Sequence, residues 1–421
     1  MNKVLIITYY WTPSGGAGVQ RWLKFAKFLP EFGWEPIVLS VDPEYVAYPV
    51  TDYSLADDLP LSVKIHRTPA IDYFSIYKKD KSKIPSAGFA NNVDNTFKGK
   101  VARFIRGNFF IPDPRKGWNR FAFKKACEII ETEGVKHVIT TSPPHSTQLI
   151  GLELKKRYPG LHWIADLRDP WTDIYYYDQF FPTFISKKID KKHERDVLRS
   201  ADKILTVGAS LKTLFSSKVK GIENKIHVLT NGFDEADFEG LVTTRPERYT
   251  ISYIGTLSDS YPIKGFLEAV GKLQEEGSDF LLRFAGAVSQ NQKNMVLSEV
   301  RSQAVEFTNY VTHANAISYM IDSSLLLIII PDHHSNKSII TGKLFEYLAA
   351  GRPILCLGPL DGDAAGIIDK LSGGVTIDYN NTEAIYSFIK ETFKNTPFIQ
   401  NSDIREFSRL NITKHLVEVL K

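Results

Sequence analysis

The fold of this chain is indicated most clearly by the stretch from Thr341 to Pro353, TGKLFEYLAAGRP. Its apolar residues Leu344, Phe345 and Leu348 recur at helical spacing, which predicts a helix with one buried side. Gly351 stands where a C-terminal cap is expected, and the apolar run that follows predicts a strand from Pro353. A helix that leads within a few residues into a strand is the repeating unit of α/β proteins.

The same alternation extends along the whole chain. In the first helix-length segment, apolar residues recur from Val19 to Leu29 and Gly33 ends the pattern. Strands that alternate with helices predict βαβ units and parallel sheets. The predicted strands are Val4–Thr8, Pro36–Leu39, His137–Thr140, His162–Ala165, Lys203–Val207, Lys225–Leu229, Tyr249–Ile254, Phe280–Phe284, Leu325–Ile330, Pro353–Leu357 and Gly374–Ile377.

The alternation starts afresh near Tyr249, after a polar, irregular stretch. We therefore expect one Rossmann-like domain over residues 1–230 and a second over residues 231–400, with 401–421 forming a helix that packs back on the first domain. We expect residues from about 70 to 118 to form an insertion in the first domain. Because ligands of open α/β sheets bind at the carboxyl ends of strands, the loops after strands are the candidate sites.

Composition indicates a soluble globular protein, with 421 residues of which 43% are hydrophobic and 24% charged. The longest apolar run, Leu325–Pro331, is much shorter than the roughly 20 residues that span a bilayer. The apolar residues after Met1 fit a first strand better than a signal peptide. Cys127 and Cys356 lack metal-ligand spacing and are expected to be buried free thiols. We expect a cytoplasmic protein without a metal site.

Positive charge is concentrated between Ile71 and Lys116. This segment holds ten basic and four acidic residues, a surplus of six against a net charge of +4 for the whole chain. It also holds many aromatic residues between Tyr73 and Phe110. Basic and aromatic residues together suit an anionic lipid surface, so a peripheral position on the inner face of the cytoplasmic membrane is one expectation. An ordinary solvated loop is the other.

Three glycines, Gly15, Gly16 and Gly18, follow the first predicted strand. Glycines let the backbone approach a ligand, and the start of the next helix offers free N–H groups to an anion. A tight turn without a ligand is the alternative. The spacing is not that of the dinucleotide fingerprint, and no acidic ribose partner is evident about 20 residues later, which argues against an NAD enzyme.

Two further loops of the first half carry polar groups. His145 stands where a helix is expected to begin, so it could bind a sugar hydroxyl or cap that helix. Asp166, Arg168 and Asp169 follow the strand at 162–165, and Trp171 adds a ring on which a sugar could stack. Carboxylates bind sugar hydroxyls or accept protons, and Asp169 is a candidate base for the acceptor. An Arg–Asp bridge that only holds a turn is the alternative.

In the second half, Gly255 and Thr256 follow a strand, and Lys264 comes a few residues later. A lysine near a glycine turn suits the charge of a leaving diphosphate. At the helix quoted first, the backbone around Gly342 and Leu344, together with the charge of Lys343, suits a phosphate. Glu346 lies one turn further and could accept both hydroxyls of a ribose. A surface pair of Lys343 with Glu346 is the alternative.

Taken together, these stretches resemble the family-4 retaining glycosyltransferases of bacterial polysaccharide and lipopolysaccharide synthesis over almost the whole chain. The resemblance rests on Thr12-Pro13-Ser14-Gly15-Gly16, Ala201–Val207, Asn231-Gly232-Phe233-Asp234 with Phe238, Gly255 with Lys264-Gly265, and Glu346 with Ala350-Gly351-Arg352-Pro353.

This resemblance implies a GT-B fold, in which two Rossmann-like domains face each other across a cleft. It also implies retaining transfer from a UDP- or GDP-sugar to a glycan or lipid-linked acceptor, with no cofactor, metal or nucleic acid required. By the resemblance, Glu346 binds the donor ribose and Lys264 the diphosphate. Gly15 and Gly16 approach the donor phosphates and the acceptor, while Asp166 and His145 lie where the family contacts the donor sugar and the acceptor.

The sequence departs from the family pattern at two positions. Ser338 stands where the first glutamate of the family signature is usual, and Thr256 stands where an arginine is usual. Lys343, Lys337 and Arg168 are candidate replacements for that positive charge. The rival functions are a GT-B sugar-nucleotide epimerase, an inactive glycosyltransferase-like scaffold, and a two-lobed solute-binding protein, which would need an export signal.

Overall fold

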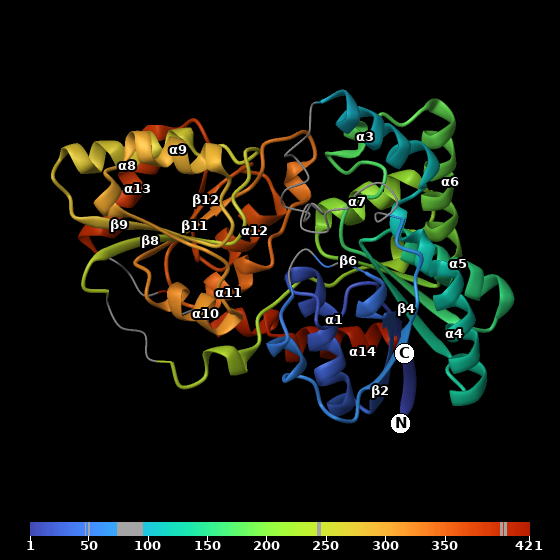
Figure 1. The fold of residues 1–421 in the computed structure, drawn as a ribbon. Helices are drawn as coiled ribbons and strands as arrows, with labels where there is room; N and C mark the ends of the chain where they lie inside the picture. Colours follow the sequence, from blue (N-terminus) through green and yellow to red (C-terminus); the bar gives the residue numbers. More distant parts are fainter. Residues whose placement is uncertain (47, 49–50, 74–95, 242–245, 396–398, 400–401) are drawn as a thin grey trace. The chain divides into compact units, whose positions relative to one another are not determined.

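The computed structural model describes the chain except for residues 47, 49–50, 74–95, 242–245, 396–398 and 400–401 (Figure 1). The described chain divides into two compact units. Unit 1 contains the described residues up to Thr230 together with Arg409–Lys421, and unit 2 contains the described residues of Asn231–Ser408. Within the residues that the structure describes, every helix is too short or too polar to cross a bilayer.

Unit 1 is built on a parallel sheet with the strand order β3-β2-β1-β4-β5-β6-β7. The polypeptide returns through a helix between most pairs of strands, as parallel pairing requires. Its strands are β1 (Asn2–Ile7), β2 (Trp34–Val41), β3 (Lys64–Thr68), β4 (His137–Ser142), β5 (His162–Leu167), β6 (Lys203–Thr206) and β7 (Ile226–Val228). Its helices are α1 (Ala17–Phe28), α3 (Phe97–Phe109), α4 (Asn119–Glu133), α5 (Ser146–Arg157), α6 (Phe184–Ser200), α7 (Ala209–Lys218) and α14 (Arg409–Leu420).

Helices cover both faces of this sheet, because alternate residues of each strand point to opposite sides. In β1, Val4 and Ile6 pack with α1 and α14, whereas Leu5 and Ile7 pack with α4 to α7. The C-terminal helix α14 therefore completes the core of unit 1, although its sequence lies more than 170 residues beyond the rest of that unit.

Unit 2 has a second parallel sheet with the order β10-β9-β8-β11-β12-β13. One face packs against α8, α9 and α13, and the other against α10, α11 and α12. Its strands are β8 (Tyr249–Ile254), β9 (Phe280–Ala285), β10 (Val305–Thr308), β11 (Leu325–Ile329), β12 (Ile354–Leu357) and β13 (Gly374–Ile377). Its helices are α8 (Lys264–Glu275), α9 (Gln290–Glu299), α10 (His313–Ile321), α11 (Lys343–Ala349), α12 (Asp363–Lys370) and α13 (Thr382–Lys394).

All eleven predicted strands are present: β8 and β13 have the predicted bounds, and the other nine differ by one or two residues at one or both ends. Two observed strands were not predicted, β3 and β10, and both lie at an edge of a sheet. An edge strand needs less apolar burial than a central strand. The residues of β3 are mostly exposed and those of β10 are half-buried, so neither strand has the continuous apolar run on which the prediction relied. The helix predicted from Thr341 is also shorter than expected, since α11 begins at Lys343.

Candidate functional site

In unit 2, two glycines bring the ends of β8 and β9 together. Gly255 and Gly286 both adopt positive φ angles, 129° and 127°, which side chains rarely allow. A Cβ atom at Gly286 would lie 2.5 Å from the carbonyl oxygen of Gly255, so only glycine permits this approach. The Gly255 N–H donates to the carbonyl of Ala285 at 2.7 Å. The carboxyl ends of two neighbouring strands therefore present bare backbone at one place.

Lys343 points at this backbone from α11. Its Nζ lies 3.2 Å from the position that a Cβ at Gly255 would occupy, and 3.8 Å from the ring centroid of Tyr253. The hydroxyl of Tyr347 accepts a hydrogen bond from the Ile254 N–H at 2.9 Å, which fixes α11 against the end of β8. The structure thus brings together Gly255 and Lys343, two residues that sequence analysis singled out separately.

Burial controls the charge of Lys343. It lowers the pKa of the ammonium group to about 7, although nearby Glu346 acts in the opposite direction. The cation–π contact with Tyr253 stabilises the charged form. Because α11 has only seven residues, its macrodipole adds little, and the lysine is the main positive charge of this loop cluster.

Glu346 has neighbours that sequence analysis missed. Its Oε1 lies 4.0 Å from Nδ1 of His313, and Nε2 of His313 lies 3.0 Å from Oδ2 of Asp237. His313 is the first residue of α10, directly after the unpredicted edge strand β10. A correct prediction of β10 would have marked His313 as a residue at the start of the helix that follows a strand.

The other predicted residues of unit 2 lie around this cluster in different ways. The backbone carbonyl of Thr256 accepts from the Tyr253 hydroxyl at 2.7 Å, so Thr256 belongs to the same loop. Gly342 immediately precedes α11, and the side chain of Leu344 is buried in the core. Lys264 begins α8, but its side chain is 86% exposed and lies 3.8 Å from Glu268. Its ammonium group is therefore at the surface.

In unit 1, Asp166 is completely buried. Its carboxylate accepts hydrogen bonds from Trp22 Nε1 at 2.7 Å and Thr141 Oγ1 at 2.7 Å, and it pairs with Arg21 Nη2 at 3.3 Å. Arg21 also donates to the carbonyl of Leu229 at 2.9 Å. Asp166 thus connects β5 with β4, with α1 and with the end of the sheet.

Arg168 joins the loops at the carboxyl ends of these strands. Its Nε donates to the carbonyl of Ser142 at 2.9 Å, and its Nη1 donates to the carbonyl of Gly18 at 3.0 Å. In the same loop as Gly18, Gly16 has a φ of 95° with open space where a Cβ would stand, and Gly15 precedes it. Burial raises the pKa of the neighbouring Asp169, against the lowering effect of Arg168.

His145 stacks on an aromatic ring. Its ring lies 4.9 Å from that of Trp171 with only 10° between the planes, and the Trp171 Nε1 donates to Asp190 at 2.7 Å. Burial lowers the pKa of His145 to about 3, so the imidazole is neutral at pH 7. The start of α5 is capped by Asp113, which accepts from the N–H and the hydroxyl of Ser146 at 2.8 Å each. His145 occupies the N-cap position of α5, but its side chain makes no capping hydrogen bond, so the alternative of a capping imidazole is not confirmed.

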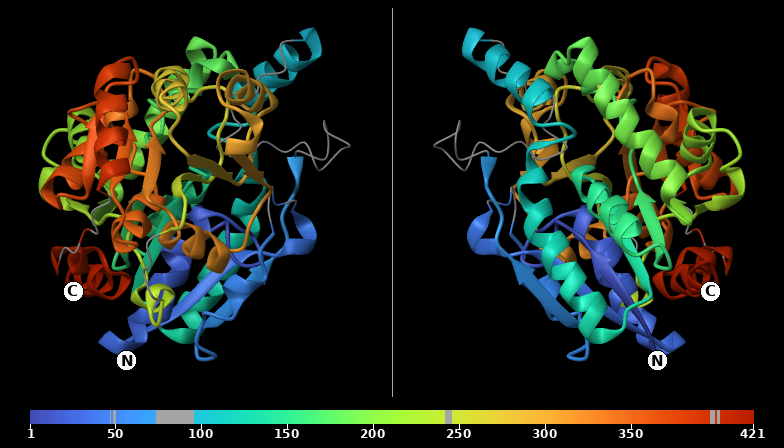
Figure 2. Two further views of the ribbon diagram at one scale, coloured as in Figure 1. Left: turned by 90° about the vertical axis from the view of Figure 1, so that its left-hand side faces the viewer. Right: turned by 90° about the vertical axis from the view of Figure 1, so that its right-hand side faces the viewer.

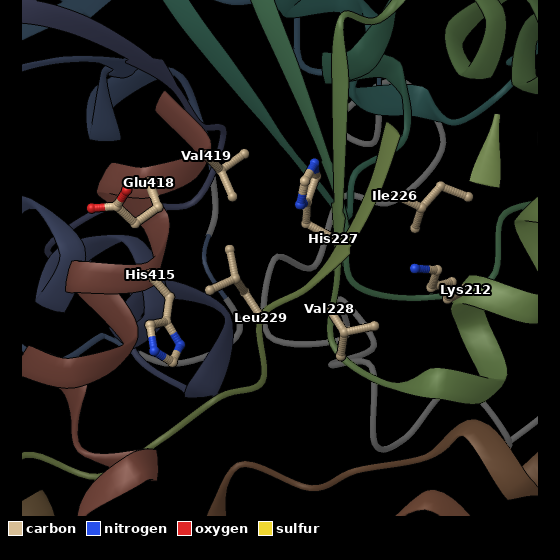
Figure 3. A pocket seen from close by; sticks show the side chains of 8 residues that line it. All are labelled: Lys212, Ile226, His227, Val228, Leu229, His415, Glu418 and Val419. Carbon is tan, nitrogen blue, oxygen red and sulfur yellow. The ribbon is translucent and has the colours of Figure 1, made fainter. Parts of the chain in front are cut away.

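A surface hollow of about 400 Å³ lies elsewhere in unit 1, between β7 and α14 (Figure 3). Its lining includes His227 from the edge strand and His415 and Glu418 from the helix. None of the predicted site residues lines it, so it is not the site that sequence analysis indicated.

Two parallel-sheet units with helices on both faces are the architecture of the GT-B class of α/β fold, and solved glycosyltransferase structures of that class match along the whole chain. Neither a protein-family model nor a curated protein sequence matches. A glycosyltransferase from Rickettsia africae ESF-5 is similar with a TM-score of 0.62 and 14% identity, covering 100% of this chain and 98% of that one. Anabaena HepE in complex with UDP has a TM-score of 0.63 and 10% identity over 100% and 99%. A structure described as a UDP-N-acetylglucosamine 2-epimerase from Listeria monocytogenes has a TM-score of 0.55 and 12% identity over 100% and 95%. At these identities the likeness establishes the fold.

Proposed function

We propose that the protein is a glycosyltransferase that binds the nucleotide part of a UDP- or GDP-sugar in unit 2. The observation that carries this proposal is the approach of Lys343 Nζ to the bare backbone of Gly255. A diphosphate fits such a place, because a buried ammonium group favours an anion and the backbone of Gly255 carries no side chain that would block its approach. Glu346, three residues after Lys343 on the same helix, is the proposed partner of the ribose hydroxyls.

The proposed reaction is direct replacement of the diphosphate. The bond between the anomeric carbon and the diphosphate oxygen breaks, and the acceptor hydroxyl forms the new bond on the same face, so the configuration is retained. The hydroxyl proton passes to the departing phosphate oxygen. Lys343 stabilises the charge that develops on this oxygen, and the exposed Lys264 is the proposed second cation, free to swing toward bound diphosphate. This electrostatic role requires no metal or cofactor.

Unit 1 is the proposed acceptor side. Asp169, whose pKa is raised by burial, is proposed to position the acceptor hydroxyl by a hydrogen bond, while the hydroxyl proton itself passes to the departing phosphate oxygen. The neutral imidazole of His145 can donate or accept a hydrogen bond to a sugar. Gly15 and Gly16 are proposed to face the acceptor, and at Gly16 the space that a side chain would fill is open. Because Asp166 is completely buried, we assign it a positioning role and no contact with substrate. The proposed acceptor is a glycan or a lipid-linked glycan of a cell-surface polysaccharide.

Nucleotide binding tests the proposal most directly. Titration calorimetry with UDP, GDP and a panel of their sugars should detect binding of at least one nucleotide. Lys343→Met should weaken that binding by about tenfold to a hundredfold, because a charged hydrogen bond to phosphate is lost. Lys370→Met is the matched control, since Lys370 is an exposed lysine of unit 2 that pairs with Glu406 and has no proposed part in binding. Absence of binding to every nucleotide would overturn the proposal and favour an inactive scaffold.

The likeness to the Listeria structure supports one rival, a sugar-nucleotide epimerase. An epimerase would convert its nucleotide sugar with no acceptor present, whereas a transferase needs the acceptor. Product analysis by mass and chromatography, with and without a glycan acceptor, therefore separates the two functions.

A further inference from the structure

Large apolar side chains are exposed together at one place in unit 1. The described part of α3 buries none of its residues, and in Figure 2 this cyan helix extends outward from the rest of the unit. Phe97 is 82% exposed, and Phe184 and Ile185 in the first turn of α6 are 81% and 69% exposed. Further exposed apolar residues are Val101, Phe104, Ile105 and Phe109 of α3, Ile189 of α6, and Phe181 just before α6. We call this set the α3–α6 surface.

The two parts of this surface are held together by defined contacts. The side-chain oxygen of Asn108 in α3 accepts from the Thr183 N–H and the Ser186 hydroxyl, both at 2.8 Å, while its amide nitrogen donates to the carbonyl of Phe181 at 3.0 Å. A Cβ at Gly107 would lie 2.3 Å from the Phe180 carbonyl oxygen, so the backbones are in close contact. The exposed side chains therefore belong to one supported surface, built from two helices.

The charge of this surface is strongly positive. Residues 97–109 and 184–192 contain eight basic residues and one acidic residue, Asp190. Asp190 is buried and bonded to Trp171 and Tyr177, so it does not face the solvent. The adjacent Asp178 pairs with Lys187 at 2.8 Å, while Lys188 and Lys191 are exposed. Around the exposed apolar groups, basic residues thus predominate.

We infer that the α3–α6 surface docks on an anionic lipid bilayer. Exposed phenylalanine and isoleucine side chains gain apolar burial at the level of the lipid head groups, and the lysines contact the anionic head groups while their stems cover apolar surface. An acidic protein partner would also match the charge. The large exposed apolar side chains, however, come from two separate elements, and a fluid bilayer can adapt its surface to both, so we favour the bilayer. This inference goes beyond the proposed function, and neither donor nor acceptor is needed to test it.

Vesicle sedimentation provides the test. The full chain should sediment with vesicles of phosphatidylcholine and phosphatidylglycerol at low salt, and much less with phosphatidylcholine alone or at high salt. Phe184→Ser with Ile185→Ser should lower binding by about tenfold or more, because apolar insertion is lost. Lys188→Glu with Lys191→Glu should abolish the preference for the anionic lipid.

The matched control is Leu61→Ser with Leu360→Ser, two exposed apolar residues outside the surface, which should bind vesicles like the unchanged chain. Circular dichroism and thermal unfolding show whether each variant is folded. If the unchanged chain stays in the supernatant at low salt, or if the Phe184 and Ile185 variant still sediments fully, the inference is wrong. A dimer in analytical ultracentrifugation that this variant dissociates would instead assign the surface to self-association and overturn the lipid proposal.

Discussion

At the residue scale, Lys343 makes a prediction about pH. Its pKa of about 7 results from burial, so the free protein loses this charge as the pH rises from 7 to 9. A bound diphosphate favours the ammonium form, so binding must then take up a proton. We expect nucleotide affinity to fall with pH over this window, approaching about tenfold per pH unit at its upper end. Calorimetry in buffers of different ionisation enthalpy measures both the affinity and the proton uptake.

Lys343→Met is the control for this prediction, because its weaker binding should vary little across the same pH window. Equal slopes for the unchanged chain and the variant would show that another group titrates.

The titration of Lys343 affects the stability of the folded protein in the opposite direction: its contribution to stability increases with pH, whereas nucleotide affinity falls. The pKa is lower in the folded state than in the unfolded chain, so the folded state binds fewer protons between the two pKa values, and this contribution to stability increases as the pH rises through that range.

A second residue-scale prediction concerns His313. If it orients Glu346 toward the ribose, His313→Ala should weaken UDP binding by about threefold to tenfold, as expected for one lost hydrogen-bonded contact. Binding of inorganic pyrophosphate should not change, since pyrophosphate has no ribose. Lys343→Met should weaken both ligands, so titration of each variant with each ligand separates the two roles. An equal loss of UDP and pyrophosphate affinity in His313→Ala would contradict an orienting role.

At the scale of elements, sequence patterns predicted what depends on local spacing and missed what depends on packing. The central strands could be predicted because burial on both faces demands a continuous apolar run, as in β11. The edge strand β10 is only half-buried and needs no continuous apolar run, so it was not predicted. His313, which begins the next helix, was therefore not recognised as a candidate residue.

The same distinction explains the candidate site. Lys343 and Glu346 share one helix, so their proximity follows from spacing alone. The approach of Lys343 to Gly255 depends on how α11 packs against β8, which is fixed by the hydrogen bond between Tyr347 and Ile254. The spacing of residues along the sequence does not predict this packing. Likewise, the burial of Asp166 results from Arg21 and Trp22, which lie about 145 residues earlier in the chain.

At the scale of the whole molecule, the two units have separate hydrophobic cores, so we expect two thermal transitions. A nucleotide at about one hundred times its Kd should raise only the transition of unit 2, by about 5–10 °C. Leu416→Ala should lower only the other transition, because Leu416 of α14 is completely buried in the core of unit 1 and its loss costs about 2–5 kcal/mol. Scanning calorimetry of the unchanged chain and of the Leu416→Ala variant, each with and without UDP, measures both transitions under all four conditions. A single transition that moved under both changes would mean that the units unfold as one, and a nucleotide that raised the transition sensitive to Leu416→Ala would place its site in unit 1.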